Sequence, residues 1–319
     1  MTPPSSSPLF IVFNLGSGHG DAAETRALIE ARCAEAGRTL HLLMVEDPRR
    51  IAEIAADAVR RARADEGIVV AAGGDGTINA VAQATLGSGC RFGVLPQGTF
   101  NYFSRATGIP ADTHEAMQLL LSGRVRPAQV GLVNERVFLV NASLGLYPKL
   151  LEDREALKRQ WGRSRLVAFW AGLMTVLRAH RNLRVEMEVH GRATEVRTPT
   201  LFVANNALQL EQLGLPEASA IEAGQLAAIT VRPAGRLAWL GLLLRGALGR
   251  LGEAEQVTSI GFRRLTVRSA RPFRRRRVKV ATDGEIVWLR LPLEFAVSPV
   301  SLDLIGPADS EATSDGPAT

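Results

Sequence analysis

Residues 67–77 read Gly-Ile-Val-Val-Ala-Ala-Gly-Gly-Asp-Gly-Thr, and this stretch decides the fold class. An apolar run over 67–72 is typical of a parallel strand that is buried on both faces. The glycines that follow allow a tight turn, and we expect a helix over 78–86. Backbone N–H groups at the start of such a helix attract anions, and phosphate is a suitable ligand.

The segments on either side repeat this order of strand and helix. We expect strands over 9–13, 39–45 and 92–95, and helices over 21–36 and 48–64. Strands that alternate with helices predict a mostly parallel sheet with helices on both faces. Ligands of such sheets bind beyond the carboxyl ends of the strands, where the glycine-rich turns of this chain are expected.

The pattern changes after about residue 127, where alternating polar and apolar residues replace several of the apolar runs. Alternation is typical of half-exposed antiparallel strands. We expect strands over 137–141, 183–189, 195–204, 226–231, 259–267, 276–282 and 285–291, and helices over 155–181 and 236–249. The sequence therefore predicts an α/β domain followed by an antiparallel β-sandwich domain.

Two further polar, glycine-rich turns follow predicted strands. Asn14-Leu-Gly-Ser-Gly18 follows the first strand, and Pro96-Gln-Gly-Thr-Phe-Asn101 follows the strand over 92–95. In the central turn, Asp75 would repel a bound phosphate unless a divalent cation lay between them, so phosphate and Mg²⁺ are expected together. The structural alternative is a tight turn in which Asp75 only caps the helix.

These three turns, together with Thr282-Asp-Gly-Glu285, resemble the diacylglycerol kinase catalytic-domain family of lipid kinases, which includes diacylglycerol, phosphatidylglycerol and sphingosine kinases. The resemblance implies an α/β ATP-binding domain over 1–127, to which a strand near 295–305 returns. It implies a β-sandwich lipid-substrate domain over 128–294, with the active site in the interdomain cleft. Residues 307–319 are expected to form a disordered tail.

The resemblance also implies roles for the matching residues. The nucleotide would be bound by Asn14, Ser17, Gly18, Gly74, Gly76, Thr77, Gly98, Thr99 and Asn101. Asp75 would hold Mg²⁺ directly or through water. Glu285 would be the general base for the acceptor hydroxyl, and Asp283 would support Glu285 or help bind metal. A hairpin turn at Asp283-Gly284 is compatible with these roles.

Several positions depart from the family pattern. Leu15 stands where the first turn usually has proline, and Tyr102 stands where the third turn usually has aspartate. Gln129 occupies a position where an aspartate often opens the second domain. Ala223-Gly224 replaces an Asp-Gly pair that some members link to a structural metal. These differences leave open a catalytically degenerate, nucleotide-binding pseudokinase at the membrane.

We therefore expect an ATP-dependent, Mg²⁺-requiring lipid kinase that phosphorylates a hydroxyl of a diacylglycerol-like or related lipid. The rival enzyme is an NAD kinase, which shares the Gly-Gly-Asp-Gly-Thr turn; the Pro96–Asn101 turn and Asp283-Gly-Glu285 favour the lipid kinase. The arginine-rich stretch over 263–279 suggests a nucleic-acid-binding protein as the rival from another class. No helix-turn-helix, zinc-finger or aromatic RNA-binding motif supports that rival, so nucleic acid is not an expected partner.

Composition bounds the cellular setting. The chain has 319 residues, a net charge of +6, 46% hydrophobic residues and two cysteines, which excludes a disordered chain and a disulfide scaffold. No apolar run reaches the length of roughly 18 residues that a membrane span needs. We expect a cytoplasmic protein peripherally associated with the inner face of the membrane. The arginine block or the apolar stripes near 161–177 and 237–244 would meet the lipid surface, and the sequence leaves the oligomeric state open.

Overall fold

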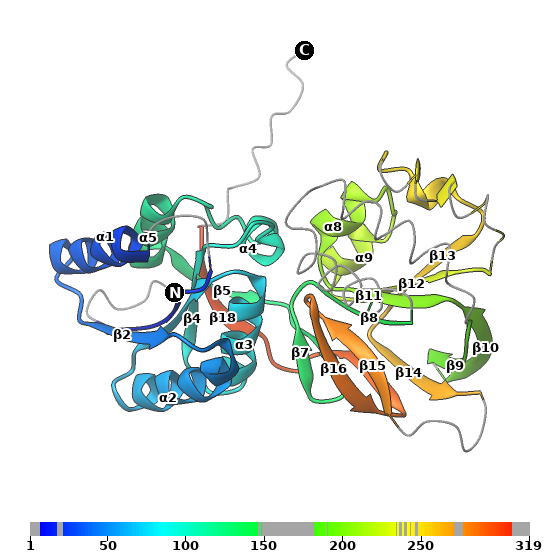
Figure 1. Ribbon diagram of the computed structural model, residues 1–319, viewed down its shortest axis with the longest axis horizontal. Helices are drawn as coiled ribbons and strands as arrows, with labels where there is room; N and C mark the ends of the chain where they lie inside the picture. Colours follow the sequence, from blue (N-terminus) through cyan, green and yellow to red (C-terminus); the bar gives the residue numbers. More distant parts are fainter. Residues whose placement is uncertain are drawn as a thin grey trace, which may run out of the picture. The chain divides into compact units, whose positions relative to one another are not determined.

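The computed structural model describes residues 7–17, 22–145, 182–189, 191–233, 248–270 and 277–307, together with a few single positions between these ranges. The chain forms two compact units. The first comprises Met1–Ala128 with Val300–Thr319, and the second comprises Gln129–Pro299. Each unit has its own sheets and core and is described by itself, with the element labels of Figure 1.

The first unit is built on one six-stranded sheet. Its strands lie in the order β2 (Leu40–Val45), β1 (Leu9–Asn14), β3 (Ile68–Gly73), β4 (Arg91–Pro96), β18 (Leu302–Gly306) and β5 (Arg124–Ala128). Neighbouring strands are parallel, except that β18 and β5 are antiparallel. All six residues of β3 are buried, which explains why its sequence is uniformly apolar.

Helices cover both faces of this sheet. Figure 1 shows α1 (Ala22–Glu35) and α5 (Thr113–Ser122) on one face, and α2 (Ile51–Ala64) and α3 (Asp75–Thr85) on the other. The chain runs from β1 outward to β2 and then back across β1 to β3. The direction of winding therefore reverses between β1 and β3. Such a reversal leaves a crevice at the carboxyl ends of the two strands, where ligands of α/β sheets bind.

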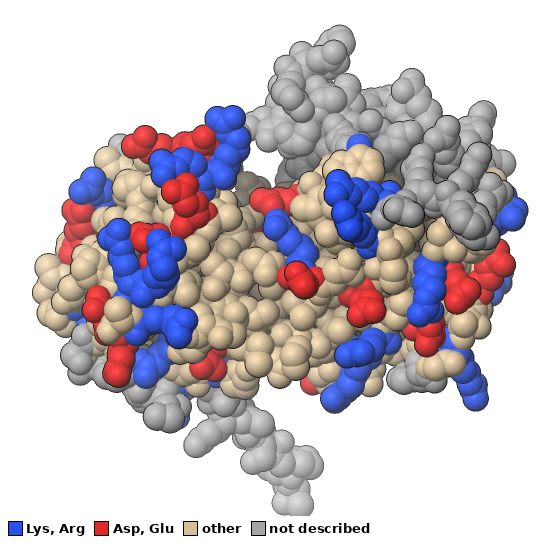
Figure 2. Space-filling view, turned by 90° about the horizontal axis from the view of Figure 1, so that it is seen from below, with Lys and Arg blue, Asp and Glu red and all other residues tan. Residues whose placement is uncertain are grey.

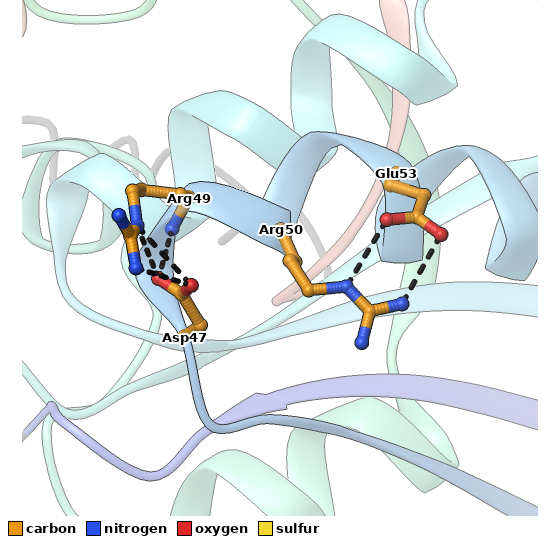
Figure 3. A network of polar contacts seen from close by, with 4 residues as sticks. All are labelled: Asp47, Arg49, Arg50 and Glu53. Atoms are coloured by element: carbon orange, nitrogen blue, oxygen red, sulfur yellow. Dashed lines mark hydrogen bonds and ion pairs between the residues drawn. The ribbon is translucent and has the colours of Figure 1, made fainter.

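A local polar network surrounds the short helix that directly precedes α2 (Figure 3). Asp47 caps the short helix η1 (Pro48–Arg50) and accepts a 3.0 Å hydrogen bond from the backbone N–H of Arg49. Hydrogen bonds from the side chain and backbone of Arg49 lower the pKa of Asp47. Arg50 pairs with Glu53 at 3.1 Å. Because these ion pairs are exposed, they contribute little stability, and the cap is the part that sets where the helix begins.

The second unit is a sandwich of two antiparallel, six-stranded sheets. One sheet has the order β10 (Arg192–Thr198), β9 (Leu183–Val189), β14 (Arg264–Ser269), β17 (Leu293–Val297), β6 (Gly131–Val133) and β7 (Arg136–Phe138). The other has the order β13 (Val257–Phe262), β12 (Leu226–Val231), β11 (Thr200–Ala204), β8 (Asn141–Gly145), β15 (Arg277–Thr282) and β16 (Glu285–Arg290). Alternate residues of both sheets meet in one core that includes Phe138, Phe262 and Phe295.

Short helices cover part of the outer face of the second sheet. Leu210 of α8 (Ala207–Gln212) and Ile221 of α9 (Ala218–Glu222) pack with Ala204, Ala227 and Ile229 in a smaller core. A single-turn helix, η2 (Leu251–Glu253), precedes β13. The short helix α4 (Tyr102–Ala106) belongs to the first unit.

The predicted fold class is confirmed: a mostly parallel α/β sheet is followed by an antiparallel β-sandwich. Three expected strands were wrong in extent, because each is divided. The expected strand over 195–204 divides at Pro199, where Thr198 Oγ1 lies 2.6 Å from the backbone oxygen of Thr200 and 2.8 Å from that of Val231. The expected strand over 259–267 divides at Arg263, where the chain passes from one sheet to the other. The expected strand over 137–141 divides because the backbone N–H groups of residues 139–141 donate hydrogen bonds to the carboxylate of Asp283.

Several sequence expectations lie outside the described residues. These are the helices over 155–181 and, apart from single positions, 236–249, and nearly all of the tail over 307–319. In the part of the chain that the structure describes, no helix combines the length and the apolar character needed to cross a membrane. On the face shown in Figure 2, lysine and arginine side chains are interspersed with aspartate and glutamate.

The return of β18 to the first sheet predicts that a residue near the end of the chain stabilises the first unit. Leu304 is fully buried between β4 and β5, so Leu304→Ala should lower the free energy of unfolding by about 2–5 kcal/mol. Asp303→Ala changes an exposed side chain of the same strand and should cost less than about 0.5 kcal/mol. Urea denaturation measures both. Equal effects of the two substitutions would contradict the position of β18 in the core.

Candidate functional site

The three predicted turns of the first unit lie at one edge of its sheet. They follow β1, β3 and β4, which are parallel neighbours. Gly73 at the end of β3 is in register with Pro96 at the end of β4, and the backbone N–H of Gln97 donates a 2.8 Å hydrogen bond to the oxygen of Gly73. The turns are therefore brought together by the parallel register of the strands.

Side chains of the first turn connect it to the other two. Asn14 Nδ2 donates a 2.9 Å hydrogen bond to Thr77 Oγ1 in the first turn of α3. Ser17 Oγ donates to the backbone oxygen of Asn14 at 2.7 Å and lies 3.4 Å from Gln97 Oε1. Asn14, Ser17 and Thr77 thus form part of one hydrogen-bonded frame, and Thr77 is buried in it.

The backbones of the second and third turns approach each other closely at Gly74 and Gly98. A Cβ atom on Gly98 would lie only 2.8 Å from the Cα of Gly74, and one on Gly73 would lie 2.5 Å from Thr77 Oγ1. Only glycine leaves room for this approach. Asn101, whose backbone is left-handed with φ 48°, closes the third turn by accepting from Gly98 N–H and donating to Gly98 oxygen, both at 2.9 Å.

Asp75 joins the two turns more strongly. Its carboxylate accepts hydrogen bonds from the backbone N–H groups of Phe103, Asn101 and Tyr102, at the start of α4. The residue before Asp75, Gly74, is the N-cap of α3 and offers no capping side chain. The structural alternative that Asp75 caps its own helix is therefore wrong, because the carboxylate serves a different helix.

The Asp75 carboxylate is also partly unsatisfied. Burial raises its pKa, and the three backbone hydrogen bonds only partly offset that effect. Its Oδ1 atom is buried and has no hydrogen-bond partner. Among the described residues, no group of three or more His, Cys, Asp and Glu side chains could hold a metal. Asp75 therefore fits Mg²⁺ only in the manner typical of nucleotide sites, with one carboxylate, phosphate oxygens and water.

In the second unit, Asp283 is a structural brace. Asp283 and Gly284 both have positive φ, 47° and 89°, and form the two-residue turn between β15 and β16. The Asp283 carboxylate accepts backbone hydrogen bonds from Leu139 at 2.7 Å and from Val140 and Asn141 at 2.9 Å. Of the two roles expected for Asp283, these contacts support the one that holds the neighbourhood of Glu285 in place. They leave no reason to make it a metal ligand.

Glu285 begins β16 and is half exposed. Its Oε2 lies 3.3 Å from a guanidinium nitrogen of Arg136, and the Nε atom of Arg136 is buried without a hydrogen-bond partner. The pair links the end of the β15–β16 hairpin to β7. A carboxylate on a rigid strand, held by one cation, can accept a proton from a bound hydroxyl.

Gln129 occupies the centre of a neutral polar network. Its Nε2 donates to Asn205 Oδ1 at 2.7 Å and to the backbone oxygen of Gln225 at 2.9 Å. Asn205 Nδ2 in turn donates to the backbone oxygen of Leu139 at 3.1 Å. The Gln129 side chain therefore supplies N–H groups to two oxygen acceptors, and this network needs no cation.

The structure groups the predicted site residues by unit. Asn14, Ser17, Gly74, Asp75, Gly76, Thr77, Gly98, Thr99 and Asn101 all lie on the three turns of the first unit, whereas Asp283 and Glu285 lie at one hairpin of the second. Gly18 lies outside the described residues. Sequence reasoning missed Gln97, Arg136 and the exposed Phe100, which stacks on Tyr102 with ring centroids 5.9 Å apart. Gln97 was within a quoted motif, but only the fold brings Arg136 to Glu285.

Two family models match the chain along most of its length. Residues 8–133 match the diacylglycerol kinase catalytic domain. Residues 153–306 match the YegS C-terminal NAD kinase beta sandwich-like domain. The first unit therefore belongs to the diacylglycerol kinase catalytic-domain family. The first match contains the three turns, and the second contains Asp283 and Glu285.

Curated relatives agree with this assignment of the first unit. Diacylglycerol kinase of Bacillus subtilis is 37% identical over 129 residues, which are 39% of this chain and 42% of that protein. A probable lipid kinase YegS-like of Klebsiella pneumoniae is 43% identical over 79 residues, 24% of this chain and 27% of that protein. An uncharacterised Synechocystis protein is 27% identical over 77% of this chain and 56% of its own length. The chain spans about half or less of the length of these relatives.

Solved structures show the same fold. A crystal structure of a diacylglycerol kinase from Bacillus anthracis has a TM-score of 0.67 and 18% identity, and the match covers 94% of this chain and 97% of that one. A further structure from the same organism reaches a TM-score of 0.71 at 19% identity. At this identity the likeness concerns the fold alone.

The contact between Gly74 and Gly98 predicts that Gly98 is sensitive to substitution. Gly98→Ala forces the second and third turns apart and should cost about 1–3 kcal/mol of stability. We also expect it to weaken nucleotide binding at least tenfold, because about 1.4 kcal/mol of lost alignment has that effect. Calorimetric titration with ATP measures the affinity.

Gly16→Ala is the matched control for this prediction. A Cβ atom there meets only Asn14 Oδ1, at an ordinary 3.5 Å, so nucleotide affinity should stay within a few-fold of the parent. If Gly98→Ala bound ATP as tightly as Gly16→Ala, the close approach of the two turns would have no part in nucleotide binding.

Burial of Asp75 predicts a pH dependence of stability. The pKa of Asp75 in the folded state is raised above its ordinary value of 3.8. The protonated carboxyl therefore adds to the free energy of unfolding in full below pH 3.8, and this stabilisation is lost as pH rises through the raised pKa. Asp75→Asn removes the titration, so its unfolding free energy should fall less over that window than the parent's. Urea unfolding at a series of pH values tests this. Parallel profiles for the two proteins would mean that the carboxylate is not held in a buried setting.

Proposed function

We propose that this chain is an ATP-dependent lipid kinase, which transfers the γ-phosphate to a hydroxyl group of a diacylglycerol-like or related lipid. The observation that carries the proposal is the close contact of two glycine turns at the carboxyl edge of the first sheet. The Asp75 carboxylate joins these turns and keeps one oxygen without a hydrogen-bond partner. Backbone N–H groups at the start of a helix, beside a carboxylate, suit a phosphate chain with its cation.

In this proposal the first unit binds the nucleotide. The amides of Asp75, Gly76 and Thr77 form the first turn of α3, where N–H groups have no partner within the helix and the helix dipole favours negative charge. Asp75 would hold Mg²⁺, which neutralises charge on the transferred phosphate. Asn14 and Asn101 keep the turns in place through the hydrogen bonds described above.

In the second unit, Glu285 would accept the proton of the attacking hydroxyl. Phosphoryl transfer depends mainly on alignment and charge neutralisation, and a positioned carboxylate adds a proton acceptor. Asp283 fixes the turn that precedes Glu285, and Arg136 restrains the carboxylate itself. Because the Arg136–Glu285 pair is partly exposed, a substrate hydroxyl can reach the carboxylate.

The relatives support a lipid as the acceptor, since those named for an activity are named diacylglycerol kinase or lipid kinase. We further propose peripheral contact with the inner face of the membrane, where such a substrate lies. An NAD kinase-like activity and a nucleotide-binding pseudokinase are the competing readings. Gln129 in place of aspartate and the restrained Glu285 are the features that favour a pseudokinase.

One incubation separates these three readings. The full chain is mixed with γ-labelled ATP, Mg²⁺ and a total lipid extract, with NAD in a parallel reaction, and the labelled products are separated. The proposal predicts a labelled lipid and no labelled dinucleotide. Labelled dinucleotide alone would indicate an NAD kinase. Nucleotide binding with no labelled product would indicate a pseudokinase.

Glu285→Gln tests the proposed base. The substitution is nearly isosteric, so ATP affinity should remain within a few-fold of the parent, while lipid phosphorylation should fall by about 10²-fold or more. Arg136→Gln is the matched variant: it frees the carboxylate without removing it, so activity should persist and its pH profile should shift. If Glu285→Gln retained most of the parent's activity, Glu285 would not be the proton acceptor.

A further inference from the structure

One face of the β15–β16 hairpin carries an exposed aromatic side chain among basic ones. The register places Arg277 opposite Arg290 and Lys279 opposite Trp288. Directly opposite residues of an antiparallel pair project to the same side, and alternate residues of a strand do so too. Arg277, Lys279, Trp288 and Arg290 therefore share one face, which is called the hairpin face below.

The hairpin face points away from the sandwich core. Val278, Val287 and Leu289, which alternate with its residues, pack against that core. Trp288 by contrast is 58% exposed. An indole ring exposed on a strand loses most of the apolar burial that its size offers, so its place is not explained by the packing of this unit.

The charge of the hairpin face has a single sign. Lys279 Nζ lies 5.3 Å from the centroid of the Trp288 ring, within the range of a cation–π contact. Arg277 and Arg290 lie opposite one another, an arrangement in which like charges repel. Among the residues of β15 and β16, all of which are described, the one acid is Glu285, which is in register with the inner face. An anionic partner would relieve the repulsion.

We propose that the hairpin face binds an anionic lipid bilayer. Trp288 would lie at the boundary between headgroups and acyl chains, where amphipathic rings are favoured, and the three basic side chains would meet lipid phosphates. β16 is the last strand in its sheet, and in the described part of the chain β15 is its one strand partner. The inference rests on the proposed function only in taking lipid as the partner, and it names the surface that reaches the membrane.

Vesicle binding by the full chain tests the proposal. Sedimentation with vesicles of phosphatidylglycerol and phosphatidylcholine should give strong binding, and vesicles of phosphatidylcholine alone should give little. Each basic residue near an anionic surface contributes about fivefold, so loss of three charges costs about 100-fold, and reversing Arg277, Lys279 and Arg290 to glutamate should weaken binding by at least that factor. Trp288→Ala should weaken it about tenfold through lost apolar burial. Indole emission should shift to the blue on vesicles in the parent and shift less in Trp288→Phe.

Matched controls exist on other strands of the second unit. Ile260→Ala removes an apolar side chain that is 44% exposed on β13, the opposite edge of the same sheet. Reversal of Arg192, Arg197 and Arg232, which are exposed on β10 and after β12, makes the same change in net charge. Both controls should bind vesicles within about twofold of the parent. Equal losses in the control and hairpin variants would overturn the proposal, because net charge alone would then explain binding.

The outcome is independent of the kinase assay. A parent that phosphorylates no lipid, yet binds vesicles through Trp288 and the three basic residues, would refute the proposed function and support the hairpin face. If the parent phosphorylates lipid, but both hairpin variants bind vesicles as tightly as the parent, the proposed function would be supported and the hairpin face refuted. Tight binding to duplex DNA that depends on the three basic residues, without Trp288-dependent vesicle binding, would also overturn the proposal and indicate a nucleic-acid surface.

Discussion

The close backbone contact between Gly74 and Gly98 is the constraint on which the candidate nucleotide site depends. The parallel register of β3 and β4 brings the two turns side by side, and the absence of a Cβ atom lets them touch. Once they touch, the Asp75 carboxylate can reach the amides at the start of α4. The first turn joins through Asn14 and Thr77. The contact that joins the two turns of the fold therefore also brings the Asp75 carboxylate to the third turn of the candidate site.

Asp75 and Asp283, the two aspartates of the motifs, make the same kind of contact. Each carboxylate accepts several backbone hydrogen bonds from a segment distant in sequence, Asp75 from the start of α4 and Asp283 from Leu139, Val140 and Asn141. Charge-assisted bonds of this kind fix loops that have no regular structure of their own. The two carboxylates differ in their remaining capacity to accept hydrogen bonds or a cation. Asp75 has a buried oxygen without a partner, so it can also bind a cation, whereas Asp283 only braces a hairpin.

Much of the first unit follows from the sequence, because buried parallel strands are uniformly apolar and their turns are rich in glycine. The second unit is harder to predict. At Pro199 and at Arg263 the chain leaves one sheet for the other; proline is a local signal of the first change, whereas the alternation of residues around Arg263 gives none of the second. The partners of Asp283 and Glu285 lie more than a hundred residues away, so their contacts emerge only from the fold. Asp75 shows a third limit of the sequence. Its motif indicated a cation site, but its hydrogen bonds to the amides at the start of α4 depend on backbone geometry that the motif does not reveal.

The central claim is that the two joined turns bind nucleotide phosphates, and hydrogen–deuterium exchange with and without Mg²⁺–ATP tests it most directly. Amides of residues 73–79 and 97–103 should exchange more slowly when nucleotide is bound, because phosphate oxygens and ordering of the turns protect them. The β9–β10 hairpin should serve as an internal reference that does not change. Protection confined to other segments, with unchanged exchange at both turns under saturating nucleotide, would contradict the account.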